Sequence, residues 1–134
     1  MFRPPTGEER QIIKYLAELA PHASEYLRQV ENCMVRITNE NDDLEISVSQ
    51  GLPVVQADIV IGPSYYLSEA IYRDTDAYIV SLMLHGGSGK LFWIEHYKPM
   101  PLPVVKKWPS TDLLVPGGEA DISKWEEALR DRGL

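Results

Sequence analysis

The sequence contains one cysteine, Cys33, and lacks any apolar run of the roughly 18 residues that a membrane-spanning helix requires. A single thiol cannot form an internal disulfide or share a zinc ion with a second cysteine, which fits a reducing cytoplasm. The first residues, Met1 to Pro5, also lack the apolar stretch of a signal peptide. We therefore expect a cytoplasmic protein that has no membrane partner.

Basic residues are scarce as well. Lysine and arginine number 13 against 20 aspartates and glutamates, and the net charge is −7. This charge repels nucleic-acid phosphates, so we expect no nucleic-acid partner. The 134 residues, of which 44% are hydrophobic, are typical of one globular domain. The predicted domain, 1–134, comprises a helical part (1–32), a sheet (33–98), an extended Pro/Gly-rich segment (99–120) and a terminal helix (121–133).

Two amphipathic helices are predicted before the sheet. Thr6 and Glu9 have the spacing of a capping box, and apolar residues recur behind them at helical intervals. This pattern predicts a helix over 7–20, which Pro21 ends. A second apolar stripe predicts another short helix over 23–30. The apolar stripes of both helices are expected to pack against a sheet.

Runs rich in β-branched residues, separated by polar or glycine-containing turns, predict a mainly antiparallel sheet. The segment 64–73 suits either a short helix or a strand, and we assign a strand only to 69–72. The predicted strands are 34–38, 44–48, 54–61, 69–72, 77–85 and 90–97. The expected fold class is α+β, in which an N-terminal helix pair packs on the sheet, a hairpin forms its centre and a C-terminal helix follows.

The central hairpin is predicted to close through the four-residue loop 86–89, Gly-Gly-Ser-Gly. If that loop sets the register, His85 lies opposite Lys90. The two faces would then combine Tyr78, Val80, Leu82 and Leu84 with Leu91, Trp93, Glu95 and Tyr97, and Ile79, Ser81 and Met83 with Phe92, Ile94 and His96. Both faces would be largely apolar, which predicts a hairpin covered on both sides or one with a face reserved for a partner.

The final third of the chain begins with Pro99, Pro101 and Pro103, which remove backbone donors and favour an extended path. Ser123 and Glu126 have the spacing of a second capping box and predict the start of the terminal helix.

Metal and cofactor sites are not expected. Asp74 and Asp76 would offer two carboxylates to a metal, but aspartates before a strand are common in turns. His22, His85 and His96 lie on different predicted elements and lack the short spacings of metal ligands. Cys33, at the start of a strand, is more typical of a small buried hydrophobic residue than of a nucleophile.

Aromatic residues gather in the middle third of the sequence. Core packing explains many of them, but tyrosine and tryptophan also anchor binding surfaces. Glu95 and His96 are titratable and, as neighbours on a strand, point to opposite faces. No catalytic residue is assigned. The candidate binding residues are Tyr65, Tyr66, Tyr72, Asp74, Asp76, Trp93, Glu95 and His96.

Several motifs, which span about residues 3 to 109, resemble an uncharacterised family of small bacterial α+β proteins. They are Arg3-Pro4-Pro5-Thr6 with Glu8-Glu9 and Ile12-Ile13, the acidic turn in 70–76, and the strand 89–98, with Pro101-Leu102 after it. Pro5 replaces the usual leucine of the opening, and Ala77 the usual glycine after the turn. The resemblance implies an α+β domain in a bacterial cytoplasm and brings no catalytic residues. Similar small acidic proteins act as immunity proteins that neutralise toxins.

The favoured hypothesis is a non-enzymatic protein-binding module. It would be an immunity protein that occludes a basic toxin domain with acidic and aromatic residues, because charge complementarity speeds such association. One alternative is a small enzyme or ligand-binding domain with a site near Glu95 or His96 of the hairpin. Another is a structural protein that forms a homodimer through an exposed hairpin face.

Overall fold

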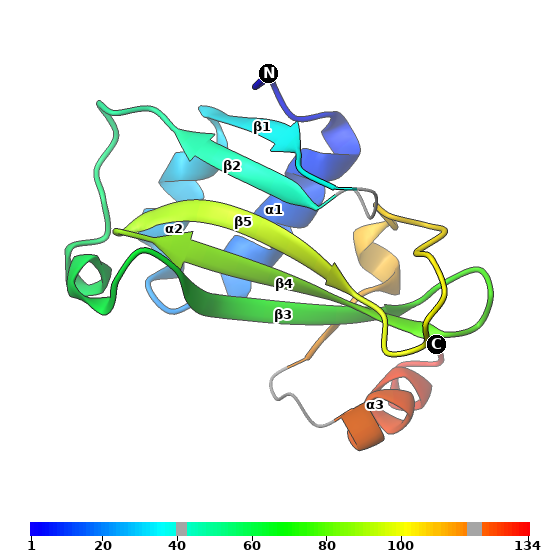
Figure 1. Cartoon of the computed structure of the whole chain (residues 1–134). Helices are drawn as coiled ribbons and strands as arrows, with labels where there is room; N and C mark the ends of the chain where they lie inside the picture. The colour runs from blue at the N-terminus through cyan, green and yellow to red at the C-terminus, as the bar shows by residue number, and fades with distance from the viewer. Residues whose placement is uncertain (40–42, 118–121) are drawn as a thin grey trace.

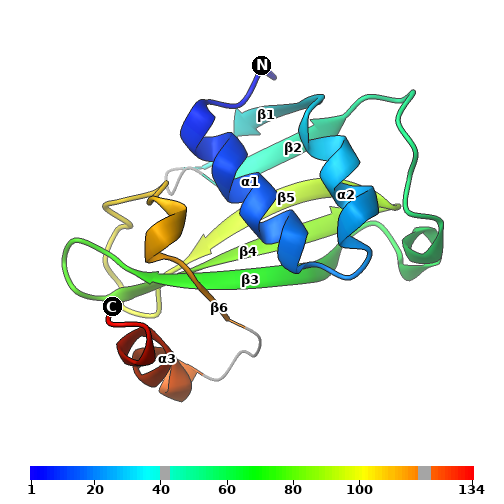
Figure 2. The same cartoon turned by 180° about the vertical axis from the view of Figure 1, so that it is seen from behind.

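The computed structural model describes residues 1–39, 43–117 and 122–134, and these form an α+β fold. Helices α1 (Gly7–Leu19) and α2 (Ala23–Val30) cover one face of a six-stranded sheet, as Figure 2 shows. The short helix α3 (Trp125–Asp131) lies at one end of the sheet, away from α1 and α2 (Figure 1). The predicted fold class is confirmed.

The predicted helix pair is also confirmed, because its signals are local. The Thr6 hydroxyl accepts a hydrogen bond from the Glu9 amide at 3.1 Å, and the Glu9 carboxylate accepts one from the Thr6 amide at 2.8 Å. Arg3 pairs with the same carboxylate at 2.7 Å. This capping box starts α1, whose buried stripe includes Ile12 and Leu16.

All neighbouring strands pair antiparallel, in the order β1-β2-β5-β4-β3-β6. Their bounds are β1 (Cys33–Ile37), β2 (Leu44–Val48), β3 (Tyr65–Arg73), β4 (Ile79–Gly87), β5 (Lys90–Tyr97) and β6 (Val115–Pro116). The main core lies between the sheet and the helix pair, where Val35, Leu44, Leu82 and Ile94 are buried. Cys33 is part of this core, as expected.

In the middle of the chain one strand prediction is wrong and another is confirmed but too short. The run 54–61 does not form a strand, because it leaves the sheet and turns as the 3-10 helix η1 (Gln56–Ile61). The Val55 amide donates to the carbonyl of Gly89, and the Asp58 carboxylate accepts from Tyr26, which pins this turn in place. Strand β3 begins at Tyr65, four residues before the predicted 69–72.

Residues 99–110 form no helix or strand and bend repeatedly, and the 3-10 helix η2 (Thr111–Leu113) follows them before β6. After the 3-10 helix η3 (Ile122–Lys124), α3 begins at Trp125, later than the predicted start. The Glu126 carboxylate binds Arg73 at 2.8 Å and so ties α3 to the sheet. Predictions for 40–42 and 118–121 lie outside the described residues.

The predicted register of the central hairpin is wrong. Gly86 and Gly87 belong to β4, and the turn consists of Ser88 and Gly89 alone. Both turn residues have positive φ, 52° and 78°, as tight two-residue hairpin turns require. A one-residue irregularity near Phe92 then places His85 opposite Trp93. Leu82 and Leu84 therefore share the buried face with Ile94 and His96, while Ser81, Met83 and His85 share the other with Trp93, Glu95 and Tyr97.

Candidate functional site

The sheet face opposite α1 and α2 is the surface toward the viewer in Figure 1. We call it the open face and define it by Glu45, Tyr66, Met83, His85, Trp93, Glu95 and Tyr97. Cross-strand pairing places these residues on one side, with His85 opposite both Tyr66 and Trp93, and Trp93 opposite Glu45. Helix α3 covers one end of this side, where the rings of Trp125 and Tyr97 meet edge to face at 6.4 Å.

A cluster of three side chains forms the centre of the open face. Nε2 of His85 lies 3.3 Å from Oε1 of Glu95, and the His85 ring lies 5.8 Å from that of Trp93. All three side chains are partly exposed. The indole N–H of Trp93 is buried and has no acceptor within the described chain. The cluster therefore presents an aromatic surface next to an acid–base pair, on rigid strands.

A second carboxylate, Glu69 on β3, points to the same side at the edge of the open face. It is 6% exposed and accepts a short hydrogen bond from the Ser81 hydroxyl. Burial raises the pKa of Glu69, and the Ser81 hydrogen bond offsets part of that effect. Ser81 lies four residues from His85 on one strand, about 13 Å away. The hydroxyl therefore has no histidine base beside it.

His96 is directed to the opposite side of the sheet, into the core. Its Nε2 donates to the carbonyl of Lys107 at 2.7 Å, and its Nδ1 lies 3.3 Å from Asp43. Its ring packs edge to face on Trp108 at 4.9 Å. Burial opposes ionisation of Asp43, but hydrogen bonds from His96 and Asn39 lower the pKa of that carboxyl below its ordinary value. His96 thus joins β5 to the C-terminal segment.

Asp74 and Asp76 form an internal ion pair network with Lys98, whose side chain is 2% exposed. Asp74 also accepts hydrogen bonds from the backbone amides of Val105 and Lys106, each at 2.8 Å. Burial would raise the pKa of Asp74, but these amides and Lys98 outweigh it and lower the pKa. Asp74 thus holds the C-terminal segment, while Asp76 accepts from the Tyr78 amide and shares Lys98, so both carboxylates are already paired within the fold.

The candidate tyrosines separate into two groups. Tyr72 is fully buried and donates to the carbonyl of Lys106. Tyr65 accepts from the Gly89 amide and lies 3.0 Å from the hydroxyl of Tyr26. Tyr66 remains on the open face and is 52% exposed. Of the eight predicted binding residues, the structure therefore brings Tyr66, Trp93 and Glu95 together on one surface.

A concavity of about 410 Å³ adjoins the open face where β2 and β5 meet. Its lining includes Glu45, Ser47, Gln50, Lys90 and Phe92. Strands β2 and β5 pair at only two positions, so the sheet is less regular here. The concavity is large enough to hold a side chain.

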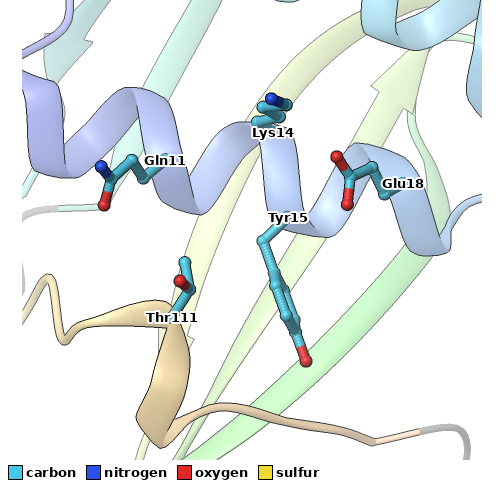
Figure 3. Close-up of a pocket in the computed structure, with 5 residues that line it drawn as sticks. All are labelled: Gln11, Lys14, Tyr15, Glu18 and Thr111. Carbon is cyan, nitrogen blue, oxygen red and sulfur yellow. The ribbon is translucent and has the colours of Figure 1, made fainter.

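Another pocket, of about 230 Å³, lies between α1 and η2 on the helical side. In Figure 3, Tyr15 extends from α1 on the side of Thr111, while Lys14 projects away. The Tyr15 hydroxyl donates to the carbonyl of Leu114 at 3.5 Å. The charged residues that line this pocket, Lys14 and Glu18, are exposed. The pocket therefore has no buried reactive group and is a weaker candidate for a functional site than the open face.

Within residues 1–39, 43–117 and 122–134, no three His, Cys, Asp or Glu side chains are placed to hold a metal ion. No helix in these ranges has the length and apolar character needed to cross a bilayer. Comparison of the chain with family models, curated proteins and solved structures gives no match.

Sequence reasoning missed Glu69, Ser81 and His85 as site residues. His85 was assigned to the hairpin but opposite Lys90, because the irregularity near Phe92 leaves no mark in the residue pattern. Glu69 did carry a signal, since it is an acidic residue beside a run of apolar strand residues. A buried carboxylate of that kind is a candidate for functional chemistry.

Proposed function

We propose that this protein is a binding module that docks a basic surface of another protein on its open face, and that the partner is a toxin which it neutralises as an immunity protein. The observation that supports this most strongly is the set of exposed aromatic side chains on a sheet face that α1 and α2 leave uncovered. Tyr66 is 52% exposed and Tyr97 41%, and Trp93 between them is partly exposed. Aromatic residues on rigid strands supply contact area at low entropic cost.

The charge of the open face supports a basic partner. Glu95 retains a partly exposed carboxylate whose neighbour, His85, lies at 3.3 Å. Many other carboxylates are used inside the fold, among them Glu9, Asp43 and Asp74. The charge available to a partner therefore comes from residues such as Glu95, within the long-range field of a chain with net charge −7.

The test is co-expression with each basic protein that is encoded beside the gene of this protein in its host. We expect the two proteins to co-purify and growth to be rescued. Glu95→Lys should weaken the complex at least about 10-fold, because like charges would then meet at the interface. Binding is measured by titration calorimetry at two salt concentrations.

Glu18→Lys is the matched control, since it makes the same charge change on α1, on the other side of the molecule. It should leave the affinity within about 2-fold, as expected for a charge outside the interface. Absence of both capture and rescue would end the immunity proposal. A chain that instead sediments as a dimer, and becomes monomeric on Glu95→Lys, would assign the open face to self-association.

A further inference from the structure

A pocket of about 240 Å³ lies along β3, between the end of α1 and β6. Figure 2 shows these three elements near one another at the lower edge of the sheet. Residues that line the pocket include Leu19, Tyr66, Leu67, Glu69, Pro116 and Gly117. Tyr66 also belongs to the open face, so the pocket adjoins the proposed docking surface.

The Glu69 carboxylate is the polar group of interest in this pocket. One oxygen, Oε2, accepts from Ser81, and the other, Oε1, accepts no hydrogen bond from the described residues. None of the ion pairs among those residues joins Glu69 to lysine or arginine. A carboxylate that is 6% exposed and lacks a cation costs stability, and a cation brought to Oε1 would offset part of that cost.

The walls of the pocket suit an aliphatic stem that ends in a cation. Leu19, Leu67 and Pro116 provide apolar surface, and the Tyr66 ring provides a π face. Gly117 lines the pocket with its backbone, close to the carboxylate. A Cβ added at this position would lie 3.3 Å from both Cγ and Oε1 of Glu69. Tyr66 and Glu69 line the same pocket, and burial, with the charge of Glu69 as the smaller cause, raises the pKa of Tyr66.

We propose that this pocket receives a lysine side chain of the partner protein, with its ammonium on Oε1 of Glu69. Lysine fits better than arginine, because Ser81 already occupies Oε2 and leaves one acceptor, whereas guanidinium groups favour bidentate carboxylates. The identity of the lysine donor rests on the proposed function. Binding of a lysine side chain in this pocket does not depend on the proposed function.

The test is an NMR titration of the ¹⁵N-labelled chain with Nα-acetyl-lysine-N-methylamide. The amides of Glu69 and Gly117 should shift in a saturable way. The norleucine analogue, which has the same stem without the charge, should cause no such shift. Equal shifts from both probes, or none from lysine, would overturn the proposal, and so would tighter binding of the arginine analogue.

Glu69→Gln keeps the shape of the side chain and should weaken lysine binding about 10-fold. It should also stay folded, because a neutral group replaces a buried carboxyl whose pKa is raised. Gly117→Ala is the second variant, and its methyl group should crowd Oε1 and weaken binding too. Unchanged lysine binding in both variants would contradict the assignment.

The two proposals fail separately. If the lysine probe does not bind while Glu95→Lys still disrupts the partner complex, the pocket assignment is wrong and docking on the open face stands. If the probe binds at Glu69 but no partner is captured, the pocket stands and the proposed function is wrong.

Discussion

Replacement of Asp74 by asparagine should lower the free energy of unfolding by about 3–5 kcal/mol, the usual result of breaking a buried ion pair from one side. The Asp74 side chain is fully buried and Lys98 is 2% exposed, so the variant leaves an ammonium with less compensation inside the protein. The amide group of asparagine also has one acceptor oxygen where the carboxylate offers two to Val105 and Lys106. Urea unfolding followed by tryptophan fluorescence measures the difference.

The Asp74 effect should depend on pH in a defined direction. Because the pKa of Asp74 is lowered in the folded state, its ionisation stabilises the protein above the ordinary carboxyl pKa of about 3.9. That stability is lost as the pH falls through the lower, folded-state pKa, so the variant should approach the parent in acid. Asp76→Asn is the control, since its side chain is 27% exposed, and it should cost only about 1 kcal/mol. A gap between Asp74→Asn and the parent that does not narrow in acid would contradict this account.

Replacement of Gln29 by leucine should destabilise the protein by about 1–3 kcal/mol, because the buried Leu91 amide loses its acceptor. Gln29 is fully buried on α2. Its amide donates to the carbonyls of Pro53 at 3.2 Å and Gly89 at 3.0 Å, and accepts from the Leu91 amide at 2.8 Å. Leucine nearly fills the volume but makes none of these hydrogen bonds. The Gly89 carbonyl keeps its bond from the Val55 amide, so the Leu91 amide is the group that loses its partner.

Two measurements test the Gln29 prediction. Urea unfolding should show the loss of stability, and hydrogen exchange should show faster exchange at the Leu91 amide than elsewhere in β5. Gln11→Leu is the matched control, because Gln11 is exposed on α1 and should change stability by less than about 0.5 kcal/mol. If Gln29→Leu unfolds at the same urea concentration as the parent, the hydrogen bonds of the Gln29 side chain do not contribute to stability.

The helical half of the fold was predictable because its signals are short-range. The Thr6 capping box, Pro21 and two apolar stripes define α1 and α2 within one residue of their observed bounds. Strand 54–61 was mispredicted because Ile59, Val60 and Ile61 are β-branched yet exposed, 88% in the case of Val60. Propensity cannot tell whether a strand partner exists, and here the chain turns away from the sheet instead.

The candidate site was predictable only in part, because it depends on register. Glu95 and His96 were correctly expected on opposite faces, since that follows from the strand period alone. Which face each occupies depends on the irregularity near Phe92, a single extra residue that exchanges the two faces. Asp74 was predicted as a binding residue, yet it binds backbone amides about thirty residues further along the chain, a long-range contact without a local sequence signal.

The most direct test of docking on the open face uses the indole N–H signals of the tryptophans. Trp93 lies on the open face, whereas Trp108 packs on His96 on the other side of the sheet. In a ¹⁵N–¹H spectrum of the labelled chain bound to its basic partner, the Trp93 indole signal should move and exchange more slowly with solvent, while that of Trp108 stays in place. A stable complex in which the Trp93 signal is unchanged and that of Trp108 moves would contradict the account.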